Sequence, residues 1–214
     1  MNDYLSIFKY AEIKIEIKRS IFIAAICPIS TEVEALDFLN NRRKEHKTAS
    51  HNVYAYRIAS KNNSQIVQRY SDDGEPSGTS GLPIFNILNG RNIQDVIVVV
   101  TRYFGGTLLG TGGLVHAYTE AATKVIDEAG LATIRLYDQY KLGLSYSNYS
   151  LVEDRLNRAD FEISSRDFTA DVTLVVDVEK NKEVEFVELV EEQSKKQARI
   201  QKLGSIYKKI KIDE

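Results

Sequence analysis

Glycine is concentrated in one short window of this 214-residue chain, because nine of the twelve glycines fall between Gly74 and Gly113. Two of the three prolines, Pro76 and Pro83, lie in the same window. Glycine permits positive φ angles and lets other groups approach the backbone closely, which suits tight turns and anion sites. The window must therefore contain irregular backbone, and we expect the functional site of the protein there.

Regular elements are predicted on both sides of this window and within it. Charged and apolar residues alternate over 12–18, and residues 21–26 are all apolar, which is typical of an exposed strand beside a buried one. Thr31 and Glu34 have the spacing of a capping box at the start of a helix. A polar turn is expected at 61–64. The other elements expected before residue 130 are strands at 52–59, 65–70 and 95–101, a short helix that ends at Asn89, and a helix at 113–129.

From about residue 135 onward the pattern is that of a second domain. Apolar and polar residues alternate over 136–146 and again over 172–178. The expected order is strand–helix–strand–strand–helix–strand within about 75 residues, which is typical of the ferredoxin-like fold. We therefore predict an α+β chain with one domain at 1–133 and a second, ferredoxin-like domain at 134–214, joined with little linker.

The composition limits the classes of protein to which this chain can belong. Its 28 basic and 30 acidic residues give a net charge of −2, so any RNA would have to be held by a local basic patch. The single cysteine, Cys27, excludes an internal disulfide framework and a cysteine-based zinc site. No apolar run approaches the ~20 residues of a membrane span, and the first residues lack the pattern of a signal peptide. We expect a soluble, cytoplasmic protein with no membrane partner.

The loop at 101–113 lies between a predicted buried strand and a predicted helix, where backbone N–H groups can gather around an anion. Its glycine spacing is similar to that of a phosphate loop, but Thr111 stands where such a loop needs a lysine. It also fails as a dinucleotide-binding motif, because Val115 replaces the third small residue. An anion site, and glycines that serve only tight turns and close packing, both remain open.

The segment at 71–81 contains three carboxylates within four residues, Asp72, Asp73 and Glu75. Three roles are open for them: to hold Mg²⁺, to cap turns and helix ends, or to pair with Arg102 or Arg69. The three histidines of the chain are too scattered to indicate a zinc hydrolase, and no G-x-S-x-G motif is present. We assign no catalytic residue, no metal and no cofactor.

The last predicted strand, at 199–211, is basic. No acidic residue lies between Lys195 and Lys211, and the seven cations of this segment are Lys195, Lys196, Arg199, Lys202, Lys208, Lys209 and Lys211. If the strand lies at a sheet edge, its lysines protect that edge against pairing with another chain. The alternative is a stripe of cations that contacts the phosphates of structured RNA.

Several motifs of the chain together resemble the YigZ/IMPACT family, in its bacterial two-domain branch. They are SDDGEPSGT at 71–79, VVVTRYFGG at 98–106 and LGTGGLV at 109–115, supported by KRSIFIA at 18–24 and HNVYAY at 51–56. The resemblance implies a ribosomal protein S5 domain 2-like first domain, with helices on one side of its sheet. It also implies a ferredoxin-like second domain similar to the last domain of elongation factor G. One departure is His116, where relatives often carry arginine, and histidine holds an anion less firmly at neutral pH.

The resemblance further implies a link to the regulation of translation initiation, because eukaryotic relatives act on its regulators by protein binding. We therefore predict a non-enzymatic cytoplasmic factor associated with structured RNA, the ribosome or a translation-regulatory protein. The alternative is a Mg²⁺-dependent enzyme that acts on a nucleotide or phosphorylated ligand. A protein contact through Tyr103 and Phe104 is a third possibility. The candidate ligand-binding residues are Asp72, Asp73, Glu75, Arg102, Tyr103, Gly105, Gly106, Gly112, Gly113 and His116, and the seven cations above are the candidate nucleic-acid contacts.

Overall fold

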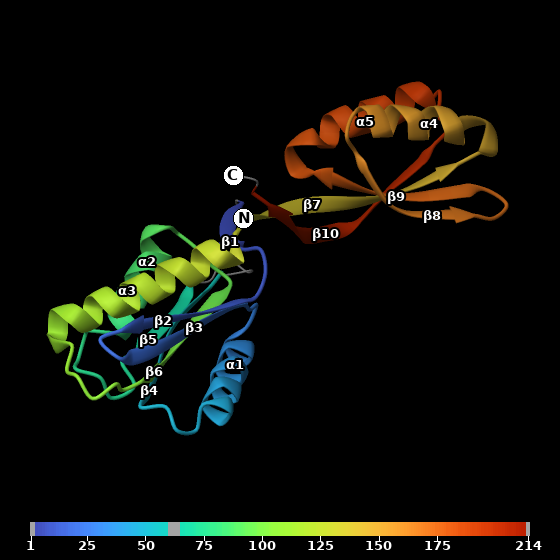
Figure 1. Ribbon diagram of the computed structural model, residues 1–214. Coiled ribbons are helices and arrows are strands. Elements are labelled where there is room, and N and C mark those ends of the chain that lie inside the picture. The colour runs from blue at the N-terminus through green and yellow to red at the C-terminus, as the bar shows by residue number, and fades with distance from the viewer. Residues whose placement is uncertain (1–2, 60–64, 213–214) are drawn as a thin grey trace. The chain divides into compact units, whose positions relative to one another are not determined.

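The structure, a computed structural model, describes residues 3–59 and 65–212, so the turn expected at 61–64 lies outside the described residues. The chain forms two compact units (Figure 1). The first contains residues 3–134 and the described residues from Lys209 onward, and the second contains Arg135–Lys208. The expected second domain at 134–214 differs from this division at its end, because residues 209–212 join the first unit. No helix in the described part of the chain is long and apolar enough to cross a membrane.

The first unit contains the elements that the sequence predicts around the glycine window. In chain order they are β1 (Tyr4–Ile7), β2 (Ala11–Ile17), β3 (Ser20–Pro28), α1 (Glu32–Glu45), β4 (His51–Ile58), β5 (Val67–Ser71), α2 (Gly81–Gly90), β6 (Val96–Tyr103) and α3 (Gly110–Ala129). Strands β2 to β6 form an antiparallel sheet in the order β2-β3-β6-β4-β5. The apolar run of residues 96–100 is thus the buried central strand, as expected.

Helices cover both faces of this sheet. α2 and α3 pack on one face, over Phe22, Val98 and Val100, and α1 packs on the other, over Ile97 and Val99 (Figure 1). Alternate residues of β6 therefore enter opposite cores, which explains why the strand is apolar and β-branched on both sides. The expectation of helices on one side only is wrong, because α1 covers the second face.

The second unit has the predicted ferredoxin-like order of elements. They are β7 (Leu131–Leu144), which begins in the first unit, α4 (Tyr146–Arg158), β8 (Glu162–Phe168), β9 (Val172–Glu179), a 3-10 turn (Lys180–Lys182), α5 (Glu183–Gln193) and β10 (Arg199–Lys211). β9 lies between β7 and β8, and β10 pairs with β7. α4 and α5 lie on one face of this sheet, and their Val152 and Phe186 pack against Leu142 and Leu174 (Figure 1). The prediction of a two-domain α+β chain is confirmed.

One short strand of the first unit is not predicted by the sequence. β1 pairs antiparallel with the first four residues of β7, with Tyr4 opposite Ile134 and Ile7 opposite Leu131. The tail of the chain meets the same segment, because the Ile212 N–H donates to the Leu131 carbonyl at 3.1 Å. Residues 131–134 are therefore held by chain segments from both ends of the described sequence.

Candidate functional site

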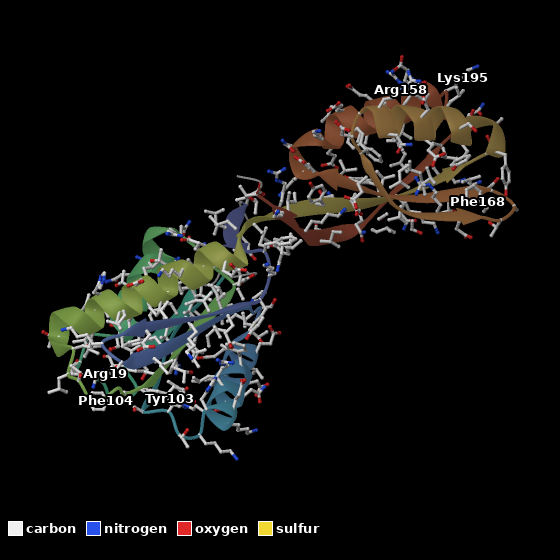
Figure 2. The ribbon with its side chains drawn as sticks, in the orientation of Figure 1. Arg19, Tyr103, Phe104, Arg158, Phe168 and Lys195 are labelled. Atoms are coloured by element: carbon white, nitrogen blue, oxygen red, sulfur yellow. The ribbon has the colours of Figure 1, made fainter. Side chains whose placement is uncertain are left out.

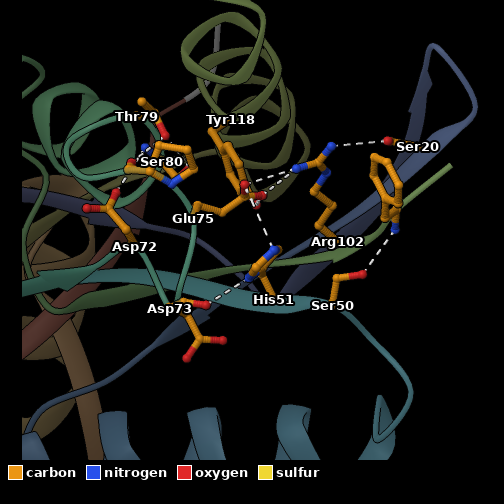
Figure 3. Close-up of polar contacts among 12 residues, drawn as sticks. Ser20, Ser50, His51, Asp72, Asp73, Glu75, Thr79, Ser80, Arg102 and Tyr118 are labelled. Atoms are coloured by element: carbon orange, nitrogen blue, oxygen red, sulfur yellow. Dashed lines mark hydrogen bonds and ion pairs between the residues drawn. The ribbon is translucent and has the colours of Figure 1, made fainter. Parts of the chain in front are cut away.

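A buried ion pair lies where β6 ends and the glycine-rich loop begins (Figure 3). Arg102 Nη1 donates to both carboxylate oxygens of Glu75, at 2.7 and 3.0 Å. Both side chains are buried, with 6% and 4% of their surface exposed. Two charges removed from water need close pairing and further hydrogen bonds to offset the cost of desolvation. The pairing of this segment with Arg102, one of the roles left open by the sequence, is confirmed.

Further hydrogen bonds surround the Glu75–Arg102 pair and connect four segments of the first unit. Tyr118 of α3 donates its hydroxyl to Glu75 Oε1 at 2.8 Å. Burial, and then the Glu75 carboxylate, raise the pKa of Tyr118 above its ordinary value, so this hydroxyl keeps its proton. Ser20 Oγ, at the start of β3, accepts from Arg102 Nη2 and from the Gly105 N–H, at 3.3 and 3.2 Å. The network therefore fixes the start of β3, the end of β6, the segment at 71–81 and α3 against one another.

The other two carboxylates of the acidic segment have separate partners. Asp72 accepts the N–H groups of Gly78, Ser80 and Gly81, at 2.8 to 3.0 Å, and so caps the beginning of α2. Asp73 accepts from Arg43 Nη2 at 2.8 Å. The capping role left open by the sequence is confirmed for Asp72. Within residues 3–59 and 65–212, no group of three histidine, cysteine or acidic side chains is arranged to hold a metal ion.

Asp73 also fixes the beginning of β4. Its carboxylate accepts the Asn52 N–H at 2.6 Å, and its backbone carbonyl lies 2.8 Å from His51 Nδ1. The other ring nitrogen, His51 Nε2, lies 3.9 Å from Glu75 Oε2. His51 thus connects Asp73 to the buried ion pair, as Figure 3 shows.

A cavity of about 470 Å³ opens above this network. Its polar side chains are those of His51, Glu75, Arg102 and Thr111. Its apolar walls come from the residues Pro76, Phe104, Leu108, Leu109 and Leu114. Sequence reasoning missed His51 and the three leucines; the available signal was the apolar pair Leu108-Leu109 inside an otherwise polar, glycine-rich loop.

The remaining candidate ligand residues serve other purposes or lie away from the cavity. Tyr103 follows Arg102 on the strand and points to the opposite face, where its hydroxyl lies 2.9 Å from His46 Nδ1. His116 is exposed on α3 and lies 3.6 Å from Glu120. Of the ten candidates, the structure places only Glu75 and Arg102 in the cavity lining.

The glycines of the loop differ from one another in their roles. A Cβ on Gly105 would lie 2.1 Å from the Arg19 carbonyl carbon, so this position allows only glycine. Gly106 has a φ of +79°, which other residues rarely adopt. Gly112 and Gly113 lie inside the first turn of α3, which begins at Gly110 rather than at the predicted residue 113. The close-packing role left open by the sequence holds for Gly105.

The turn between β2 and β3 lies against this loop. Ile17 pairs with Ser20, so Lys18 and Arg19 are the two turn residues, with φ angles of +46° and +69°. Both side chains are exposed. Arg19 and Phe104 lie at the same end of the first unit (Figure 2). Phe104 and Leu108 are 49% and 83% exposed. We call Lys18, Arg19, Phe104 and Leu108 the rim.

The seven cations near the end of the chain do not form one stripe. Lys202 Nζ pairs with Asp138 at 2.6 Å, and Lys208 Nζ pairs with Asp177 at 2.5 Å and with Glu162 at 2.7 Å. Lys209 and Lys211 belong to the first unit, where the ammonium of Lys209 donates to the Phe8 carbonyl and that of Lys211 lies 5.9 Å from the centre of the Phe8 ring. Lys195 and Lys196 are exposed in the turn after α5, and Arg199 lines a separate cavity.

Comparisons with known proteins cover both parts of the chain. Residues 18–126 match the Impact N-terminal domain, and residues 142–195 match a domain of unknown function, DUF1949. The chain is 32% identical to the IMPACT family member YvyE of Bacillus subtilis, over 90% of this chain and 87% of that protein. It is 34% identical to the IMPACT family member YigZ of Escherichia coli, over 80% and 83%.

A solved structure is similar over the whole length. The crystal structure of a hypothetical protein aligns with 100% of this chain and 99% of that chain, at 30% identity and a TM-score of 0.61. The first domain match contains all the motifs that carry the resemblance, and the alignment with YvyE extends over most of both domains of this chain. The chain therefore belongs to the IMPACT family.

Proposed function

We propose that this protein is a translation-linked factor that acts in the cytoplasm by binding structured RNA of the ribosome through the rim of its first unit. One observation supports this proposal above the others. The rim combines two exposed cations with an exposed aromatic ring, and a rigid buried network lies beneath it. Family membership supports the link to translation, because the first unit contains the match to the Impact N-terminal domain and the resemblance implies that eukaryotic relatives act on regulators of translation initiation.

The chemistry of the rim suits RNA. Lys18 and Arg19 are positioned to contact phosphates, and each contact releases counterions and so makes binding dependent on salt. Phe104 offers a face on which an unpaired base can stack. The guanidinium carbon of Arg102 lies 5.6 Å from the centre of the Phe104 ring, which holds this ring against the network.

The charged groups beneath the rim favour binding over catalysis. Glu75 and Arg102 neutralise each other and are buried, and Asp72 is occupied by the N–H groups of α2. A reacting group has to be accessible and poised to change its protonation or to attack a substrate. The arrangement therefore supports a fixed surface that recognises a partner.

The test is the double variant Lys18→Asn/Arg19→Gly. Asn-Gly is a favoured pair for a two-residue turn with positive φ at both positions, so the variant removes two charges and keeps the hairpin. We expect binding to a labelled ribosomal RNA hairpin and to purified ribosomal subunits to weaken about 10-fold at physiological salt. The slope of log affinity against log salt should become about 2 units less steep.

The matched control is Arg91→Gln/Lys124→Gln, which removes two cations from α3 and the end of α2. Arg91 pairs with Asp127, which lies 17 residues after Gly110, the first residue of α3. The rim lies near the start of α3, so these control residues are far from it along the helix. Unchanged affinity and salt slope in the turn variant, or an equal loss in the control, would contradict the proposal.

A translation-regulatory protein is a second candidate partner. The observation that favours it is the exposure of Phe104 and Leu108 above an apolar-walled cavity. An apolar protein contact resists salt, whereas contacts to phosphates do not. Co-sedimentation with ribosomes that persists at high salt and is lost in Phe104→Ser/Leu108→Ser would favour this candidate over RNA.

A further inference from the structure

We propose that a cavity on the uncovered face of the second-unit sheet binds a phosphodiester group of the RNA backbone, an inference that rests on the proposed function for the identity of its ligand. The cavity has a volume of about 450 Å³. Lys141 of β7 and Arg199 of β10 both line it. It belongs entirely to the second unit and is separate from the rim.

The two cations differ from their neighbours in having no acidic partner. In the part of the chain that the structure describes, neither Lys141 nor Arg199 forms an ion pair. In contrast, Lys202 and Lys208 are paired with Asp138 and Asp177. A cation neutralised by a close carboxylate has little attraction left for a phosphate, whereas an unpaired one keeps it.

Strand geometry directs both cations to the same face. Leu142 and Leu144 of β7 and Leu174 of β9 point into the core beneath α4 and α5. Because side chains alternate along a strand, Lys141 and Thr173 point to the opposite face, which α4 and α5 do not cover (Figure 1). The face therefore presents its cations to a ligand from solvent.

Gly143 keeps the floor of the cavity open. A Cβ at this position would lie 3.5 Å from the Arg199 Cβ, so Gly143 and Arg199 are neighbours on adjacent strands. The lack of a side chain at residue 143 leaves the space between Lys141 and Arg199 unfilled. Hydrogen-bond donors lie at its edge: Asn148 donates to Gln197 Oε1 at 3.1 Å, which leaves the Gln197 amide hydrogens to donate elsewhere.

The net charge of the lining matches that of a phosphodiester in magnitude. Lys141 and Arg199 contribute two positive charges and Asp171 one negative charge, which leaves a net charge of +1. A phosphodiester carries one negative charge, whereas a phosphate monoester carries nearly two at neutral pH. The uncovered face has no aromatic residue at the cavity positions of β7 and β9, so it offers hydrogen bonds and charge to the backbone rather than a surface on which bases stack.

The experiment measures binding of a labelled RNA hairpin by fluorescence anisotropy over a series of KCl concentrations. We expect Lys141→Gln/Arg199→Gln to weaken binding about 10-fold and to make the salt slope about 1 unit less steep, because the cavity binds one phosphodiester group. Gly143→Val should also weaken binding, because it fills the floor without changing any charge. Its Cβ meets Arg199 only at an ordinary contact distance, so the strand should tolerate it.

The matched control is Lys195→Gln/Lys196→Gln, which removes two exposed cations of the same unit outside the cavity lining. Equal losses of RNA affinity in the control and in Lys141→Gln/Arg199→Gln would contradict the proposed site. Such a result would indicate that RNA is attracted non-specifically by the positive charges of the second unit. Wild-type binding that is unaffected by Lys141→Gln/Arg199→Gln and by Gly143→Val would overturn it too, while the proposed function would stand. A wild-type protein that binds neither the RNA nor ribosomal subunits would remove the proposed function.

A second experiment, with inorganic phosphate, distinguishes a free phosphate from a phosphodiester of RNA as the ligand of the cavity. In a two-dimensional NMR titration, inorganic phosphate would shift the amide signals of 141–145 and 197–201 if it binds in the cavity. Such shifts in a protein that does not bind RNA would identify a free oxyanion as the ligand, and would contradict the proposal that the ligand is the RNA backbone. If inorganic phosphate displaces bound RNA only weakly, the result supports a phosphodiester of the RNA backbone as the ligand.

Discussion

At the scale of single residues, Glu75 and Arg102 determine whether the loop end of the first unit keeps its shape. Glu75→Gln leaves the Arg102 charge buried without a counter-ion, and such a change costs about 3–5 kcal/mol in other buried pairs. We expect the free energy of unfolding, measured by urea denaturation with circular dichroism, to fall by at least about 3 kcal/mol. Arg43→Gln, which removes an exposed partner of Asp73, should cost no more than about 1 kcal/mol. Similar losses in the two variants would show that burial of the pair is unimportant.

Gly105 and Gly112 provide a second test at this scale, because they belong to one motif but have different surroundings. A Cβ on Gly105 would meet the Arg19 backbone at 2.1 Å, whereas a Cβ on Gly112 would meet nothing within 4 Å. Gly105→Ala should therefore lower the melting temperature strongly. Gly112→Ala should leave it unchanged or raise it, since alanine favours a helix by up to about 1 kcal/mol over glycine. A mild effect of Gly105→Ala would mean that the turn at 18–19 moves aside readily.

At the scale of elements, local sequence patterns predicted those features that depend on residues close to one another in the chain. One half of the capping box at the start of α1 is present, with the Glu34 N–H donating to Thr31 Oγ1 at 3.2 Å. The Glu34 carboxylate accepts from the Ser30 N–H at 2.7 Å, and not from the Thr31 N–H as the full box requires. The alternation of β2 is present as well. β1 was missed because its four residues have no pattern of their own and pair with a strand that begins at residue 131. The start of α3 was placed three residues late, because packing around Leu114 overrides the low helix propensity of the preceding glycines.

The candidate site was predicted in part for a similar reason. A carboxylate near an arginine in a glycine-rich motif is a signal that sequence carries, and the pairing of Glu75 with Arg102 was among the expected roles. Whether a loop residue faces a cavity depends on the path of the loop and on which face a strand residue points to. Tyr103 and Phe104 are neighbours in sequence, yet Tyr103 packs against His46 while Phe104 lines the cavity.

Asp138 connects two strands of the second unit and gives that contact a dependence on pH. It accepts hydrogen bonds from Lys202 and Ser205 of β10, at 2.6 and 2.5 Å. Burial alone would raise the pKa of Asp138, but these hydrogen bonds outweigh burial and hold it below its usual value. The stabilisation is therefore present above the ordinary pKa of about 3.9 and is lost as pH falls through the depressed value.

Asp138→Asn should lower the free energy of unfolding by about 1–2 kcal/mol at pH 7 and by much less at an acidic pH below the depressed pKa of Asp138. Urea denaturation at both pH values measures the difference. Glu188→Gln, which alters an exposed acid of the same unit, is the control and should change little at either pH. A cost of Asp138→Asn that is equal at both pH values would rule out the charge as its cause.

At the scale of the whole molecule, the described residues pass twice between the two units, at 134–135 and 208–209. Ending the chain after Lys208 removes the hydrogen bond from the Ile212 N–H to Leu131, and that from Lys209 to the Phe8 carbonyl. We expect faster hydrogen exchange of the amides of 131–134 and a lower melting temperature. Lys209→Ala/Lys211→Ala keeps the backbone and should reproduce little of this effect. Equal exchange rates in the shortened and full chains would show that the tail contributes nothing to the first unit.

The net charge of −2 means that RNA would be attracted only locally. If the rim contributes two phosphate contacts and the second-unit cavity contributes one, the slope of log affinity against log salt should be about −3. Replacing Lys18, Arg19, Lys141 and Arg199 together should bring the slope close to zero. A steep slope that survives this fourfold change would place the contacts elsewhere on the molecule.

The return of the tail to the first unit has a consequence for biosynthesis. Residues 209–212 are translated after the whole of Arg135–Lys208, yet they complete a unit whose other residues end at Ile134. The hydrogen bond from Ile212 to Leu131 therefore cannot form until all residues of the second unit have been synthesised. The first unit, although most of it is made first, is completed by residues that are made after the second unit.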